Sequence, residues 1–296
     1  MSVVTVPATQ FDPPGPAAGR LINSEIVKIR TTNTWWIFLL GSLGTTALAL
    51  LVNMLQAHFI LTQPTPEGMS AEDAATFALQ KDSIVQATNI YTSGQFFGVL
   101  FVMLVGMVIV TNEFHHQTAT TTYLATPHRT AVISAKLVAA TLIAVLFWLI
   151  TTAVDLAAGA IFLSAEGYPA SLGEPEVIKA ILFNLMAYVI WAIFGVGFGI
   201  LIRSQLGATI TGTAVYLIGY PAAFIIFNLI HEFLIKKDWV LTAMVAVPAV
   251  ASQVAVSPVK GWPQSPPQWV GVVVLIGYAL VAGLIGILIN RRRDVS

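Results

Sequence analysis

The sequence contains no cysteine and very few charged residues. Only 9% of its 296 residues are Asp, Glu, Lys or Arg, whereas soluble domains carry about 25%. The absence of cysteine excludes disulfides, thiolate metal sites and a cysteine nucleophile. The formal net charge is zero, so no basic surface for nucleic acid is indicated. Because so little charge cannot cover a water-facing surface, most of the surface is expected to face lipid.

Apolar residues make up 56% of the chain and are gathered in long runs. A helix needs about 20 apolar residues to cross the hydrocarbon core of a bilayer. Six runs meet that length: 35–61, 94–112, 136–163, 178–202, 207–234 and 269–290. The sequence therefore predicts an all-α integral membrane protein with six transmembrane helices.

The first residues differ in composition from the rest. Residues 1–19 contain Pro and Gly but neither the basic start nor the apolar core of a secretory signal. We expect a flexible cytoplasmic tail there, followed by a single transmembrane domain over 20–296.

A further apolar stretch, 239–258, is nearly long enough to span. Pro248 and Pro258 interrupt it, and Ser and Gln dilute it, which favours short re-entrant helices between spans five and six. Basic residues give an independent test, because they collect on the cytoplasmic side. They precede the first span at 20–30 and follow the last at 291–293, so only an even number of spans fits.

With six spans, every arginine lies on the inner side. The inner set is Arg20, Lys28, Arg30, Arg129, Lys136, Arg203, Arg291, Arg292 and Arg293, and the outer set is Lys81, Lys179, Lys236, Lys237 and Lys260. We therefore expect a multi-pass protein of the plasma membrane, with both termini in the cytoplasm.

The segment 20–34, before the first span, has a weakly amphipathic pattern. Ile22, Ile26 and Ile29 share one helical face, with Glu25 close to it. The pattern favours a helix lying flat at the cytoplasmic interface. A frayed lead-in to the first span is the alternative.

The cytoplasmic loop 111–136 is polar and rich in Thr. Asn112 is placed to cap a short helix beginning at Glu113. Such a loop is too short for a domain but long enough to present a helix to a partner. A metal site at Glu113, His115 and His116 is disfavoured, since adjacent His side chains on a helix point about 100° apart.

Three stretches carry a resemblance to a known family. They read SEIVKIRTTNTWW at 24–36, VTNEFHHQTATTTYLATPHR at 110–129 and SAKLVAA at 134–140. Over about 20–296 the chain resembles the bacterial membrane subunits of the ABC type-2 transporter permease family. The matching loop positions are Glu113, Phe114, His115, His116, Thr118, Thr120, Pro127 and Arg129.

The resemblance implies how the protein works. The family has an elbow helix before span one, here carrying Glu25, Lys28 and Arg30, and re-entrant helices between spans five and six. It also has a coupling helix after span two that docks on a separate ATPase subunit. Its residues here would be Glu113, Phe114, His115, His116, Thr118 and Thr120.

The expected partners follow from the same resemblance: an ABC ATPase, a second permease copy or homologue, membrane lipid, and a small-molecule, lipid or glycan substrate moved outward. The chain has no G-x-x-x-x-G-K-[ST] phosphate loop. ATP hydrolysis is therefore expected on the partner, and we expect no enzymatic activity, metal or cofactor in this chain.

Asp155 is the one acid well inside a predicted span. Intramembrane acids are functional candidates by default. It could bind a cation or carry a proton, which would favour a proton- or ion-coupled secondary transporter. It could equally hydrogen-bond a neighbouring Thr. A membrane-embedded enzyme is disfavoured, because Asp155 has no catalytic partner at helical spacing.

Two further patterns have a plain interpretation. His231 and Glu232 begin an H-E-x-x-H zinc motif, but Ile235 stands where the second histidine is needed. Gly195 and Gly199 have small-xxx-small spacing, which predicts close helix packing.

Overall fold

A computed structural model describes residues 18–64, 68, 70–118, 122, 124, 126, 128–202, 204–257 and 262–292. Every regular element within these residues is a helix. Nearly all of the predicted tail, 1–19, lies outside them.

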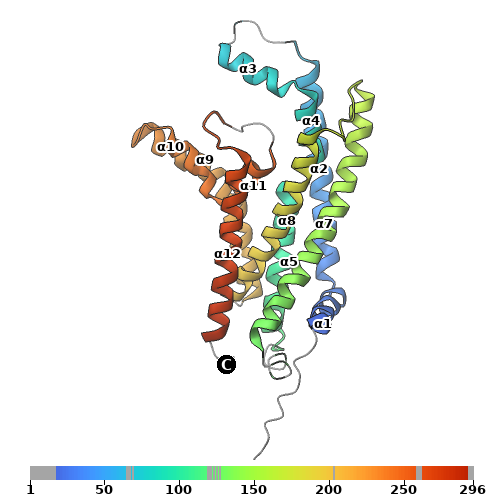
Figure 1. The fold of residues 1–296 in the computed structure, drawn as a ribbon, viewed down its shortest axis with the longest axis vertical. Helices are drawn as coiled ribbons and strands as arrows, with labels where there is room; N and C mark the ends of the chain where they lie inside the picture. The colour runs from blue at the N-terminus through green and yellow to red at the C-terminus, as the bar shows by residue number, and fades with distance from the viewer. Residues whose placement is uncertain are drawn as a thin grey trace, which may run out of the picture.

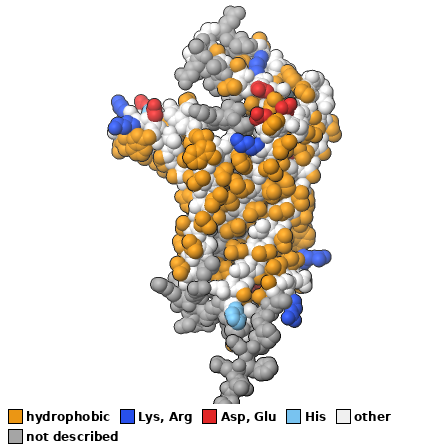
Figure 2. Space-filling model, viewed as in Figure 1, with side chains coloured by type: hydrophobic (Ala, Val, Ile, Leu, Met, Phe, Trp, Pro, Cys, Tyr) orange, Lys and Arg blue, Asp and Glu red, His pale blue; other side chains and the backbone are white. Residues whose placement is uncertain are grey.

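Six helices are long and apolar enough to cross a membrane. They are α2 (Thr34–Thr62), α5 (Gln95–His115), α7 (Arg129–Ala165), α8 (Pro175–Ile202), α9 (Gln205–Phe233) and α12 (Gln268–Arg292). Figure 2 shows apolar side chains covering the middle of the visible face, with charged groups toward its ends. The chain is a multi-pass membrane protein, as predicted.

Shorter helices precede the first span and follow it. They are α1 (Ala18–Arg30), α3 (Ala71–Gln80) and α4 (Ser83–Tyr91). The sequence pattern did not indicate α3 or α4. Because α4 leads almost directly into α5, the apolar unit of membrane length is Ser83–His115, which is longer than the predicted span 94–112.

The segment 239–257 does not form one straight helix. It contains α10 (Trp239–Thr242), the 3-10 helix η1 (Ala243–Ala246) and α11 (Pro248–Val256), and its two halves are bent by 99°. Pro248 stands at the first position of α11, where its missing N–H costs nothing. In Figure 1, α9 ends and α12 begins toward the same end of the molecule. This arrangement fits six spans.

The helices define two ends of the molecule. Figure 1 places α1, the last turn of α5, the start of α7 and the end of α12 together at one end, and α3 and α4 at the other. We call these the α1 end and the α3 end.

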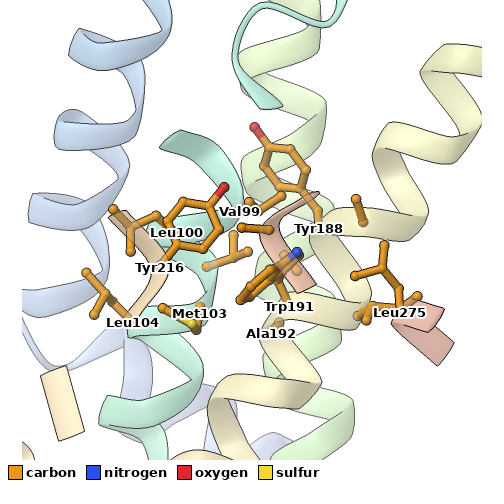
Figure 3. Close-up of a cluster of buried hydrophobic side chains, with 14 of the residues drawn as sticks. Val99, Leu100, Met103, Leu104, Tyr188, Trp191, Ala192, Tyr216 and Leu275 are labelled. Atoms are coloured by element: carbon orange, nitrogen blue, oxygen red, sulfur yellow. The ribbon is translucent and has the colours of Figure 1, made fainter. Parts of the chain in front are cut away.

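The centre of the bundle is α5, most of whose residues are buried. Its apolar face packs against α8, α9 and the bent segment. The contact in Figure 3 joins α5 to α8, α9 and α12 through Val99, Leu100, Met103, Leu104, Tyr188, Trp191, Ala192, Tyr216 and Leu275.

Glycine permits the close approach of α5 and α8. A Cβ at Gly195 would lie 2.1 Å from the Met103 carbonyl oxygen, and one at Gly199 would lie 2.8 Å from that of Met107. On the facing helix, a Cβ at Gly106 would lie 2.4 Å from the Ala192 carbonyl oxygen. The packing role predicted for Gly195 and Gly199 is confirmed, and the contact they make lies within this chain.

Candidate functional site at the α1 end

Four charged side chains from three helices meet at the α1 end. Lys28 Nζ lies 2.7 Å from Glu25 Oε1 and 2.7 Å from Glu113 Oε1. Lys136 Nζ lies 2.8 Å from Glu25 Oε2 and 2.9 Å from Glu113 Oε1. Each charge thus contacts two of opposite sign, and the four sum to zero. We call these four residues the charge cluster.

Three of the four side chains are withdrawn from solvent. The exposed fraction is 3% for Lys136, 5% for Glu25 and 8% for Glu113, against 46% for Lys28. Buried charges are tolerated when they are paired and hydrogen-bonded. The cluster therefore fastens α1 to the end of α5 and the start of α7, and removing one member leaves another uncompensated.

Lys28 remains charged at neutral pH. Burial alone would lower its pKa, but the hydrogen bonds to Glu113 and Glu25, and their charges, raise the pKa above the ordinary lysine value. The stability these contacts give is present below the ordinary pKa and is lost only as the pH rises through the higher folded value.

Glu25 explains why the α1 pattern is only modestly amphipathic. It lies on the buried face of α1 beside Ile29, where an acid weakens the apolar stripe. Lys136 supplies the compensating charge from α7. The residue that weakens the pattern is therefore the one that anchors the helix.

The end of α5 corrects one expectation. Asn112 does not cap a helix that begins at Glu113, because α5 continues to His115. The helix closes with Gln117 N–H donating to the Phe114 carbonyl at 3.3 Å and Thr118 N–H donating to the Glu113 carbonyl at 2.9 Å.

Gln117 has a φ of 55° in this closing turn. The pattern is the Schellman motif, which glycine usually completes. Glu113 thus sits in a last turn, where the helix dipole disfavours an acid. Lys28 and Lys136 offset that cost.

The loop residues differ in exposure. His115, His116 and Thr118 are exposed, whereas Phe114 is half-buried against the core. The two imidazole rings meet edge to face with centroids 4.9 Å apart. Thr120 and Pro127 lie outside the described residues, as does most of 119–127.

Arg30, the third predicted elbow residue, is exposed and takes no part in the charge cluster. Beside the cluster is a cavity of about 400 Å³ between α1, α2 and α5. Lys28, Trp35, Ile109 and His116 are among its lining residues. Among the described residues, no three His, Cys, Asp or Glu side chains are grouped as metal ligands would be.

A second polar site lies deep in the bundle, where α5 begins. The Gly94 N–H donates to Asp155 Oδ2 at 3.0 Å, and the Tyr188 hydroxyl donates to the Gly94 carbonyl at 3.1 Å. Asp155 is 1% exposed, and its Oδ1 has no hydrogen-bond partner among the described residues. A carboxyl group at the N-terminus of α5 complements the helix dipole.

This site depends on Gly94 and Tyr188, which sequence reasoning missed. A Cβ at position 94 would lie 2.8 Å from Thr46 Oγ1 and 3.3 Å from Asp155 Oδ2, so glycine is needed there. Lys136 was missed at the first site. The available signal was a lysine at the very start of the predicted span 136–163, and it was assigned only to a side of the membrane.

Comparison with known proteins places the chain in a family. Residues 46–296 match the family described as "Protein of unknown function (DUF2705)". Among curated proteins, no match was found. The matched range covers α5, α7 and all later helices, including Glu113, Lys136 and Asp155. The chain therefore belongs to the DUF2705 family.

Proposed function

We propose that the chain is the membrane-spanning permease subunit of an ATP-driven transporter of the ABC type-2 kind, working with a separate ATPase subunit. The observation that carries the proposal is the charge cluster. It joins α1 to both helices that flank the loop 116–128. A partner that pushes on this loop would move α1, α5 and α7 together.

The exposure of each side chain decides which residues of the loop can contact a partner. The Glu113 carboxylate is buried and already has two cationic partners in its own chain. It therefore positions the loop instead of contacting an ATPase. His115, His116 and Thr118 are exposed at the end of α5, and we assign the docking contact to them.

We propose that the protein lies in the plasma membrane and that its α1 end faces the cytoplasm. Two features support this orientation: the basic residues before α2 and at the end of α12, and the shared position of α1 and the end of α12 (Figure 1). In this orientation α1 is the interfacial elbow helix, and 239–257 is re-entrant from the outer side.

Docked ATPases would close on ATP and tilt the spans, exposing the substrate path outward. A second permease copy or homologue would complete the transporter. The bundle in Figure 3, with α5 at its centre, would carry the motion, because α5 contacts α2, α7, α8 and α9.

The test is co-purification from the native membrane. The tagged chain is extracted in mild detergent, and its bound proteins are identified. The proposal expects an ATPase with a phosphate-binding loop, and ATP hydrolysis by the complex. If the chain purifies intact without any ATPase, and no hydrolysis is found, the proposal fails.

A secondary transporter is the rival function, and Asp155 is the observation that favours it. The carboxyl group is buried, and one of its oxygens has no partner within the described part of the chain, as a proton or cation carrier would require. Its bond to Gly94 N–H gives it a structural role as well. Vesicles containing Asp155→Asn distinguish the two: loss of transport driven by a proton gradient without ATP would favour the rival.

A further inference from the structure

A polar pocket opens on the side of the bundle in the half toward the α3 end. It has a volume of about 400 Å³ and lies between α2, the junction of α4 and α5, and α11. Its polar lining consists of Asn53, Asn89, Thr92, Ser93, Gln95, Gln253 and Ser257. Among the described residues that line it, none is Asp, Glu, Lys, Arg or His.

Part of this lining is held in place by a hydrogen-bond network. Asn53 Nδ2 donates to Ser93 Oγ at 2.9 Å, and Gln253 Nε2 donates to Gln95 Oε1 at 2.7 Å. Gln95 Nε2 in turn donates to the buried Ser252 Oγ at 2.7 Å. Gln95 is thus occupied within the protein and fixes the orientation of Gln253.

Other amide groups in the pocket remain available. Among the described residues, no side-chain hydrogen bond is made by Asn89, whose amide carries two donors and an acceptor. Asn53 and Gln253 each donate one side-chain hydrogen bond, and their amide oxygens accept none from the residues that the structure describes, which leaves them for a ligand. Polar groups inside a membrane need partners, so the pocket is suited to a ligand with several hydrogen-bonding groups.

The rest of the lining is apolar, and part of it is exposed on the outside of the bundle. Leu48 and Val52 on α2 are 60% and 53% exposed, and they sit at the pocket's edge. Phe96 and Phe97 lie edge to face at 5.1 Å and add aromatic surface. A ligand can therefore reach the pocket from the membrane, with an apolar tail left beside α2.

We propose that this pocket binds the neutral sugar end of an amphiphile. The proposal names the substrate class of the permease, and in that respect it rests on the proposed function. Amides donate and accept at short spacing, as neighbouring sugar hydroxyls do, and an aromatic ring packs against the C–H face of a sugar ring. Among the described lining residues a charged headgroup would find no counter-ion, and uncompensated charge in the membrane is costly.

The test uses the purified chain in phosphatidylcholine nanodiscs, with no ATPase present. Thr92→Cys places a single thiol in the pocket, since the chain has no cysteine. Its labelling rate with a water-soluble maleimide is measured against octyl β-glucoside, octyl phosphate and octyltrimethylammonium. These probes share one tail, so only the headgroup differs.

The proposal expects saturable protection by octyl β-glucoside alone. Asn89→Leu, added to the reporter, should weaken that protection about five- to tenfold. It should leave the fold intact, because Asn89 makes no side-chain hydrogen bond among the described residues. Asn228→Leu, on the exposed side of α9, is the matched control and should change nothing. Gln253→Leu is the second variant, expected to weaken protection likewise.

Equal protection by all three octyl probes would mean that only the tail binds, and would overturn the proposal. Full protection in both Asn89→Leu and Gln253→Leu would do the same. The binding test does not depend on an ATPase. If octyl β-glucoside binds but the separate co-purification experiment finds no ATPase, the permease role fails and the pocket stands. An ATPase complex with no sugar binding would refute the pocket alone.

Discussion

Replacing Lys136 with methionine is the sharpest test of the charge cluster. Met keeps the length and volume of the apolar stem and removes the charge. The Glu25 and Glu113 side chains, which are 5% and 8% exposed, would then share only the half-exposed Lys28. The cluster would carry a net charge of −1 at a buried site.

The structure sets the size of the effect. Removing one partner of a buried ion pair costs about 3–5 kcal/mol, and Lys136 is 3% exposed and contacts two carboxylates. We expect a loss of about 3 kcal/mol, or more than about a hundredfold in the unfolding equilibrium. Adding Glu25→Gln should restore part of the stability, because it returns the cluster to neutrality.

The assay is unfolding of the purified chain in mixed micelles by increasing dodecyl sulfate, followed by circular dichroism. Lys179→Met is the matched control. Lys179 is exposed at the start of α8 and lies 5.5 Å from the Phe183 ring centroid, so its loss should cost under about 0.5 kcal/mol. If Lys136→Met cost no more than Lys179→Met, the cluster would not fasten the three helices.

Three further predictions use the same unfolding assay. Gly195→Ala places a Cβ 2.1 Å from the Met103 carbonyl oxygen and should destabilise the fold by about 1–3 kcal/mol. Gly219→Ala is the control and should not destabilise it, because nothing lies within 4 Å of the added Cβ. Equal effects would contradict the packing argument. In Asp155→Asn the side-chain oxygen still accepts the Gly94 N–H, so the free energy of unfolding should hardly change, while Asp155→Leu should lower it by about 1–3 kcal/mol. Equal effects of the two substitutions would contradict a structural role for Asp155. Gln117→Gly should stabilise by up to about 1 kcal/mol, because φ is 55° there; destabilisation would contradict it.

The long helices could be predicted from hydropathy alone, because a span needs only length and apolarity. The six predicted runs correspond to α2, α5, α7, α8, α9 and α12. Hydropathy could not predict the residue at which α5 ends. Glu113 looked like the start of a polar loop helix, but its charge is neutralised by Lys28 and Lys136 from distant parts of the chain, so it remains in α5.

The candidate sites show the same limit. Glu25, Lys28 and Glu113 were singled out, but their mutual contact was not expected, because Lys28 and Glu113 are 85 positions apart. Lys136, on a third helix, completes the cluster. Asp155 was noted as an intramembrane acid, yet its partner is a backbone N–H at Gly94, which carries no sequence signal. The pocket at Asn89 is formed by four helices and was not anticipated.

The central claim is that the exposed end of α5 docks on an ATPase. A single cysteine at His116 and another at Gly173 give a direct comparison in the cysteine-free chain. Gly173 lies in the segment between α7 and α8, which contacts α4 through the hydrogen bond from the Tyr91 hydroxyl to the Ala170 carbonyl. Each variant is treated with a thiol-to-amine crosslinker in native membranes, and the joined proteins are identified. The account predicts an ATPase crosslinked through His116→Cys and none through Gly173→Cys. The account would be contradicted if an ATPase were crosslinked only through Gly173→Cys. It would also be contradicted if neither cysteine were crosslinked to an ATPase in membranes where the complex hydrolyses ATP.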